Sequence, residues 1–179
     1  MKPALLVIDV QQGLFDETPR PFEADTVIER INTLTSRARQ AGVPVVFIQH
    51  ETADDELAHG SQNWQLQCGL QVAPNDTKLR KTTPDSFLHT NLEELLDSWN
   101  VEQVVICGYA TEFCVDTTTR RAAALGYPVT LAADAHTTHD KKHANGLQIR
   151  THHNATLSGI DSFGPRIQAV PTSELHFQE

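Results

Sequence analysis

The sequence has 179 residues, a formal net charge of −9 at pH 7 and three cysteines. The length is most simply that of one domain spanning 1–179. The acidic charge argues against general binding to nucleic acid or to anionic membranes, because both need clustered Lys and Arg. A small-molecule partner is therefore expected. No stretch is apolar enough to span a bilayer, and the chain begins with a strand pattern rather than a signal peptide, so we expect a cytoplasmic protein. The cysteines lack the spacing of a disulfide scaffold or a zinc finger.

Short apolar runs alternate with helical patterns along the chain. Strands are expected where apolar or β-branched residues follow one another without polar alternation. They lie at residues 4–9, 43–48, 77–81, 101–108, 127–132 and 167–170. Helices are expected at residues 22–41, 91–99, 113–126 and 141–157. This alternation predicts an α/β fold in which helices cover both faces of a mostly parallel sheet.

Two segments between these elements are expected to be loops. Residues 11–15 connect the first strand to the first helix, and residues 49–76 are polar and lack periodicity. Loops as long as the second are uncommon in a compact domain and are usually functional.

Residues 107–116 turn a buried strand into a helix and place a cysteine at the junction. Thr111 is expected to be the N-cap, which puts Cys114 in the first helical turn. Unpaired backbone N–H groups and the positive end of the helix dipole meet there, and both favour thiolate over thiol. The pattern predicts a nucleophile. The alternative is a small apolar side chain in the core, the commoner fate of a free cysteine.

Two further chemically active side chains are expected at the same rim of the sheet. Asp9 ends the first strand and Lys81 ends the third, while Cys114 opens the helix after the fourth. Ligands of parallel sheets bind beyond the carboxyl ends of the strands. Asp9 could accept the thiol proton, and Lys81 could offset the charges of carboxylate and thiolate. The alternatives are a loop-capping carboxylate and a solvated lysine on an edge strand.

The histidines suggest no complete metal site. His139 and His143 have the helical i, i+4 spacing that a metal could use, but nothing completes the set. The long loop contains further possible ligands, which are more simply solvated side chains or substrate contacts: His50, Glu51, Asp54, Asp55 and His59. We therefore expect neither a metal nor a cofactor.

The order and spacing of several motifs make the chain resemble the isochorismatase-like cysteine hydrolases, a family that includes nicotinamidases and N-carbamoylsarcosine amidohydrolases. The matching pieces are Leu5-Leu6-Val7-Ile8-Asp9-Val10-Gln11, Lys81 with Asp85-Ser86-Phe87, the run from Val105 to Val115, and Gly126-Tyr127 with Asp134-Ala135. They cover most of the chain. The resemblance implies a three-layer α/β/α, Rossmann-like fold with a six-stranded sheet.

The resemblance also implies the site and its chemistry. Asp9, Lys81 and Cys114 would form a catalytic triad, and a cis peptide between Tyr109 and Ala110 would aim the N–H groups of Ala110 and Cys114 at the substrate as an oxyanion hole. The thiolate would attack an amide-like carbonyl, and water would hydrolyse the thioester. Family members commonly form dimers or larger assemblies, so a homo-oligomer is expected.

Departures from the family pattern narrow the substrate class. The Asp-x-His metal motif of nicotinamidases is missing at Gln49-His50-Glu51, and Cys114 is present although isochorismatases cleave a vinyl ether without a cysteine nucleophile. We therefore expect metal-free hydrolysis of a small amide, ureide or N-carbamoyl compound. Vinyl ether hydrolysis and a non-catalytic, redox-responsive or binding role of Cys114 are the alternatives.

The expected substrate contacts combine an apolar wall with two polar side chains. The loop 60–66 resembles a segment that approaches the pocket in other family members. The expected contacts are Phe15, Trp64, Tyr109, Phe113, Gln12 and His50, with ordinary core packing as the alternative for the four aromatic residues.

Overall fold

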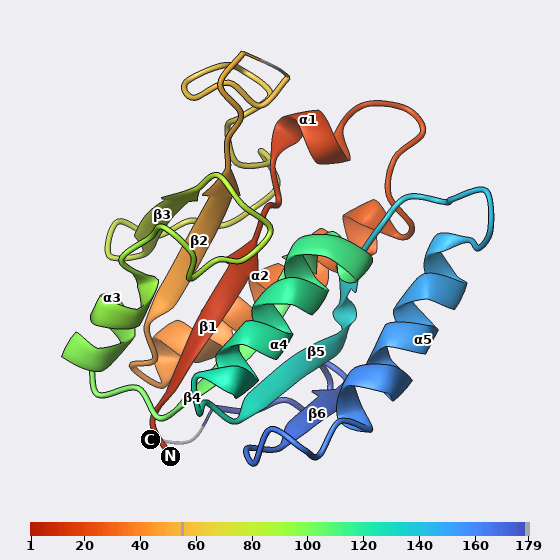
Figure 1. Ribbon diagram of the computed structural model, residues 1–179. Coiled ribbons are helices and arrows are strands. Elements are labelled where there is room, and N and C mark those ends of the chain that lie inside the picture. The colour runs from red at the N-terminus through yellow and green to blue at the C-terminus, as the bar shows by residue number, and fades with distance from the viewer. Residues whose placement is uncertain (55, 178–179) are drawn as a thin grey trace.

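A six-stranded parallel sheet forms the centre of the molecule (Figure 1). The computed structural model describes residues 1–54 and 56–177. The strands are β1 (Pro3–Ile8), β2 (Val45–His50), β3 (Thr77–Lys81), β4 (Gln103–Tyr109), β5 (Val129–Thr137) and β6 (Ile167–Val170). Their order is β3-β2-β1-β4-β5-β6, and every neighbouring pair is parallel. The predicted fold class is confirmed.

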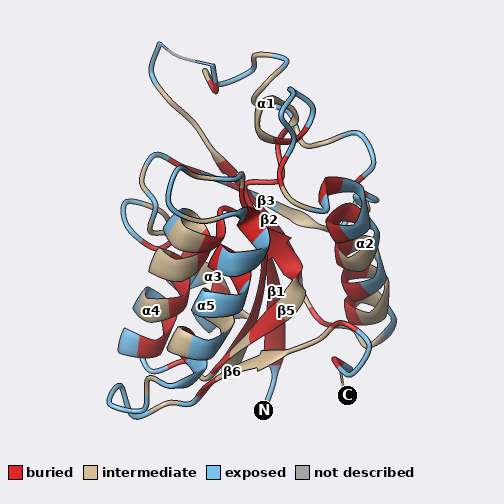
Figure 2. Ribbon diagram, turned by 90° about the vertical axis from the view of Figure 1, so that its right-hand side faces the viewer, coloured by how far each residue is buried: buried red, intermediate tan, exposed pale blue. Residues whose placement is uncertain are grey.

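Helices cover both faces of this sheet, as Figures 1 and 2 show from two sides. They are α1 (Gln12–Phe15), α2 (Ala24–Gln40), α3 (Leu92–Ser98), α4 (Asp116–Ala124) and α5 (Gly146–Ser158), with a π-helical turn η1 (Thr111–Val115) before α4. Alternate side chains of β1 enter two separate cores. Leu6 and Ile8 pack with residues of α3, α4 and α5, while Leu5 and Val7 pack with α2. Burial on both faces explains the absence of polar alternation in β1.

Two helices of the structure differ from the sequence-based prediction. Residues 12–15, expected within a loop, form α1. Helix α5 begins at Gly146 rather than at residue 141, because Asn145 and Gln148 form a capping box in which each side chain accepts the backbone N–H of the other. His139 and His143 therefore lie before the helix, and the i, i+4 argument for a metal pair does not apply.

The order of the strands reverses beside Asp9. The chain runs outward from β1 to β2 and β3, then returns to the other side of β1 as β4, and the strand ends beside such a reversal are where α/β sheets bind ligands. Gly108 lets the end of β4 approach β1 closely: it has φ +115°, and a Cβ there would lie 2.1 Å from the carbonyl oxygen of Ile8.

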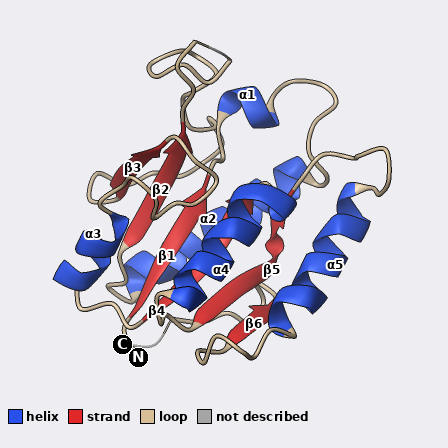
Figure 3. Ribbon diagram, in the orientation of Figure 1, coloured by secondary structure: helices blue, strands red, loops and turns tan. Residues whose placement is uncertain are grey.

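The long connection between β2 and β3 rises beyond the carboxyl ends of the strands (Figure 3). It is pinned to α1 by backbone hydrogen bonds from Gln12 N–H to the Gln65 carbonyl at 2.9 Å and from Gly13 N–H to the Asn63 carbonyl at 3.0 Å. Asp55, one of its possible metal ligands, lies outside the described residues. No helix within 1–54 and 56–177 has the length and apolar character needed to cross a bilayer.

Candidate active site

Lys81 lies at the centre of a buried polar cluster. Its Nζ is 2.8 Å from Asp9 Oδ2, 3.0 Å from the Thr83 carbonyl oxygen, 3.1 Å from His50 Nδ1 and 3.2 Å from Cys114 Sγ. The Lys81 side chain is 0% exposed and that of Asp9 2%. The structure thus brings the three predicted triad residues together, and Lys81 is not a solvated edge-strand lysine.

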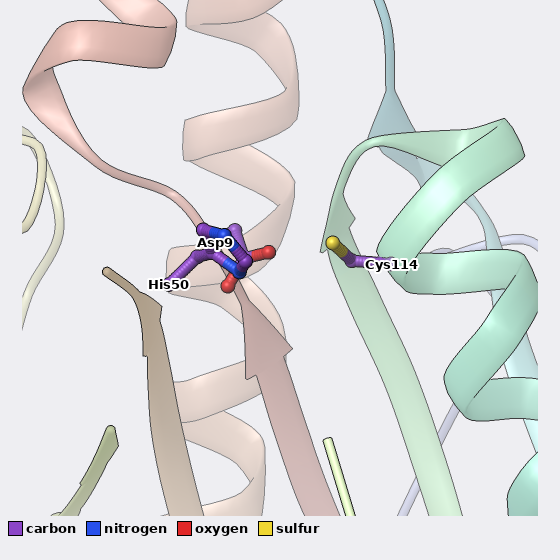
Figure 4. A group of neighbouring side chains, drawn as sticks. All are labelled: Asp9, His50 and Cys114. Carbon is purple, nitrogen blue, oxygen red and sulfur yellow. The ribbon is translucent and has the colours of Figure 1, made fainter. Parts of the chain in front are cut away.

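Strand ends and register position these side chains. Asp9 follows the last residue of β1 with φ +51°, a left-handed conformation that ends the strand. His50 and Lys81 are the last residues of β2 and β3 and are paired in register, so they stand side by side at the rim. Cys114 approaches from the other side, and its sulfur points toward Asp9 (Figure 4).

The turn that carries Cys114 is not the regular helix start that its sequence predicts. Ala110, not Thr111, is the N-cap, and the Ala110 carbonyl accepts hydrogen bonds from Phe113 N–H at 3.0 Å and from Val115 N–H at 3.1 Å. The second bond is the i→i−5 contact of a π-turn. A regular α-helix would pair this carbonyl with the N–H of Cys114 instead. The peptide bond between Tyr109 and Ala110 is cis.

The surroundings of Cys114 favour the thiol, whereas the helix terminus was expected to favour the thiolate. Burial and the negative charge of Asp9 raise the pKa of Cys114 to about 12, and Lys81 opposes them only in part. The pKa of His50 is lowered, first by burial and then by the positive charge of Lys81. A neutral His50 can accept a hydrogen bond from the ammonium group through Nδ1. The ammonium has three N–H donors for four neighbouring acceptors, so these acceptors compete for it.

Lys81 occupies the position that a metal ion would need at this site. One ligand atom each from Asp9, His50 and Cys114 lies within 4.8 Å of the others. The ammonium group of Lys81 contacts all three residues and already supplies the positive charge among them. A divalent cation held by this set would have to displace Lys81.

The predicted aromatic residues occupy different environments. Phe15 is buried and packs edge-on against Tyr109, with ring centroids 5.8 Å apart, so it supports that ring from within the core. The Tyr109 hydroxyl is 2.7 Å from His139 Nδ1. Phe113 is 54% exposed, and Lys141 Nζ lies 5.6 Å from its ring centroid. The role of these residues in substrate binding stays a prediction.

Gln12 and Trp64 belong to the contacts of the long loop. The Gln12 amide donates to the Leu66 carbonyl at 3.2 Å and also contacts Cys68 and Gln62, so its side chain is engaged by the loop. The Trp64 ring packs edge-on against His59 with centroids 4.7 Å apart.

Gln11 belongs to the motif at the end of the first strand, and its sequence position predicted no role for it. Its amide donates to the carbonyls of His50 and Trp64, each at 2.9 Å, and accepts the His50 N–H at 2.9 Å. It is fully buried and ties the loop to the rim of the sheet. A glutamine two residues after a buried, Asp-terminated strand was the available signal.

Comparison with known proteins identifies the family of this chain. Residues 3–162 match the model of the Isochorismatase domain. The chain belongs to the isochorismatase family. A crystal structure of an isochorismatase family protein superimposes with a TM-score of 0.86 at 36% identity, covering 94% of this chain and 97% of that one.

Several relatives carry names that describe an activity, among them a streptothricin hydrolase and a ureidoacrylate amidohydrolase. Streptothricin hydrolase of Streptomyces noursei is 38% identical over 138 residues, which are 76% of this chain and 50% of that protein. Ureidoacrylate amidohydrolase RutB of Cronobacter turicensis is 27% identical over 169 residues, covering 74% of this chain and 73% of the relative. The chain thus spans half the length of the streptothricin hydrolase.

Proposed function

We propose that this protein is a cysteine hydrolase that cleaves the C–N bond of a small amide, ureide or N-carbamoyl compound through a thioester. Asp9 is the general base and acid, Cys114 the nucleophile, and Lys81 the cation that stabilises their shared negative charge. The names of the two relatives, a hydrolase and an amidohydrolase, support the reaction class.

The observation that carries the proposal is the position of Lys81 between two possible anions. Its Nζ is 2.8 Å from the Asp9 carboxylate and 3.2 Å from Cys114 Sγ. Moving the thiol proton to Asp9 therefore leaves one cation and one anion in contact, and the net charge of the buried cluster does not change. Among the described residues, Asp9 Oδ1 is buried without a hydrogen-bond partner and is free to take this proton.

Besides a proton acceptor for the thiol, the reaction needs a place where negative charge can develop on the substrate oxygen, and the π-turn provides it. Because the Ala110 carbonyl already accepts two other N–H groups, it is poorly available to the N–H of Cys114. That N–H and the one of Ala110 are the donors we assign to the substrate oxygen. Two such donors stabilise a tetrahedral intermediate without reorganisation.

The reaction balances without a cofactor. Asp9 takes the thiol proton, the sulfur bonds to the carbonyl carbon, and the C–N bond breaks as Asp9 returns the proton to the departing nitrogen. Water then adds to the thioester, its oxygen forms the acid product, and the thiol is regenerated. A raised thiol pKa fits this sequence, because the thiolate is needed only while substrate occupies the site.

Release of ammonia or amine from a panel of primary amides, N-carbamoyl compounds and ureido compounds tests the function. The purified protein is expected to hydrolyse at least one class, and acid quenching followed by mass spectrometry should find an acyl group on Cys114. Cys114→Ala should abolish turnover, whereas Cys68→Ala, which changes an exposed thiol, should not. Unchanged turnover by Cys114→Ala on a confirmed substrate would contradict the mechanism.

A further inference from the structure

His136 joins the nucleophile turn to helix α5 through a buried chain of hydrogen bonds. It lies on β5, is 0% exposed, and both ring nitrogens have partners. Nδ1 is 2.8 Å from Thr111 Oγ1, and Nε2 is 2.8 Å from Asn154 Oδ1. Thr111 is fully buried as well and stands between the cis peptide and Cys114.

An irregularity in β5 brings His136 to this place. Ile106 pairs with Leu131, but Gly108 pairs with His136, so a step of two residues along β4 corresponds to a step of five along β5. A regular ladder would have placed residue 133 beside Gly108. Bulges that redirect a side chain in this way are frequent next to active sites.

Fixed partners hold the irregular segment of β5. Asp134 accepts hydrogen bonds from the Thr172 N–H at 2.8 Å and hydroxyl at 2.7 Å, and its other oxygen is 3.3 Å from Arg30 Nε. The Asn154 amide donates to the Ala133 carbonyl at 2.8 Å. The extra residues of β5 are thus pinned on both sides.

These contacts fix one of the ring hydrogens. Because the Asn154 NH₂ group donates to Ala133, its oxygen faces His136, and Nε2 must carry the hydrogen. If the ring is neutral it has one N–H, and in that state Nδ1 accepts and the Thr111 hydroxyl donates. Burial is the main reason that the pKa of His136 is lowered, to about 4. The positive charges of Arg150 and His153 lower this pKa further. The hydrogen bond with Asn154 and the negative charge of Asp134 act in the opposite direction.

We propose that His136 is a positioning residue for the nucleophile: its ring holds the Thr111 hydroxyl and thereby the turn that presents Ala110 and Cys114 to substrate. This role rests on the proposed function. Thr111 is adjacent to Ala110 in the chain, so a fixed Thr111 side chain constrains the backbone from which the two assigned N–H donors project. Charging the ring would turn Nδ1 into a donor and force the hydroxyl to rotate.

The first arm of the test needs no substrate. Long-range ¹H–¹⁵N NMR spectra of histidine-labelled protein are expected to show His136 with hydrogen on Nε2 and a bare Nδ1, unchanged from pH 8 to pH 5. Hydrogen on Nδ1, or titration with an ordinary histidine pKa near 6.5, would overturn the proposal.

The second arm uses a substrate found with the amide panel. Thr111→Val should lower kcat about tenfold or more while KM stays within about twofold, and Thr111→Ser should restore kcat to within about threefold of the parent. Thr156→Val is the matched control, because it removes an exposed Thr–His contact on α5 and should change neither constant. Equal losses in the Val and Ser variants, or a change in KM alone, would refute positioning by the hydroxyl.

The two proposals fail in different ways. A Cys114→Ala protein that still turns over a confirmed substrate defeats the cysteine mechanism. An inactive Cys114→Ala protein together with a fully active Thr111→Val protein leaves the mechanism standing and defeats the role of His136.

Discussion

Replacing Lys81 with methionine removes the cation from the buried cluster and keeps an unbranched side chain of similar length. The Asp9 carboxylate then stays 2% exposed without its partner at 2.8 Å. At an effective dielectric constant of about 20, two unit charges at that separation attract by about 6 kcal/mol. Part of this attraction offsets the cost of removing both charges from water, and the net loss on breaking a buried pair is about 3–5 kcal/mol. We expect the free energy of unfolding to fall by that amount.

The double variant separates an uncompensated charge from lost packing. Asp9→Asn with Lys81→Met leaves no net charge at these two positions, so at least about 2 kcal/mol of the loss should return, although activity should not. Arg80→Met on the same strand is the control: its ion pair with Glu51 involves an arginine side chain that is 54% exposed, so its loss should lower the free energy of unfolding much less than the loss of Lys81.

Urea unfolding of the four proteins at pH 7, followed by circular dichroism, measures these differences. A change in midpoint at constant slope reports stability. If Lys81→Met unfolds within about 1 kcal/mol of the parent, as exposed pairs do, or if the double variant is no more stable than Lys81→Met, the charge argument is wrong.

Two predictions follow from the pKa shifts. Iodoacetamide alkylation of Cys114 should be slow at pH 8, and its rate should keep rising through pH 10, because the pKa of the thiol is raised to about 12. Asp9→Asn should speed the reaction at pH 8, because the charge of Asp9 raises that pKa. A rate that reaches a plateau near pH 9 would contradict the raised pKa. For His136, the folded-state pKa of about 4 lies below the ordinary 6.5, so its contribution to stability is present above pH 6.5 and is lost as the pH falls toward 4. The shift corresponds to a loss on the order of 3 kcal/mol, which urea unfolding at pH 7, 5.5 and 4.5 should begin to reveal; a His136→Asn protein with the same pH dependence as the parent would argue against it.

The sequence by itself determined the layered fold and indicated three members of the central cluster. Apolar runs such as 4–8 have no polar alternation because both faces of a parallel strand are buried, and this signal is local. Asp9, Lys81 and Cys114 could be assigned to one rim because parallel strands all present their carboxyl ends to the same edge. Their contacts with one another follow from topology, which the alternation of elements predicts.

Other features were decided by tertiary structure alone. The helix terminus predicted a thiolate at Cys114, but the pKa depends on burial and on Asp9, which is more than one hundred positions away in the chain. The start of α5 depended on whether the Asn145–Gln148 capping box or the helical pattern from residue 141 prevailed, and the capping box did.

The position of His136 is the clearest example of a feature that local sequence cannot predict. Its sequence neighbourhood gives no sign that β5 takes five residues to cover two of β4, because the irregularity is held by Arg30, Thr172 and Asn154 from three separate segments. Local patterns report which residues are apolar and where an element can begin. Ladder register and the protonation of a buried ring depend on partners that only the folded chain brings together.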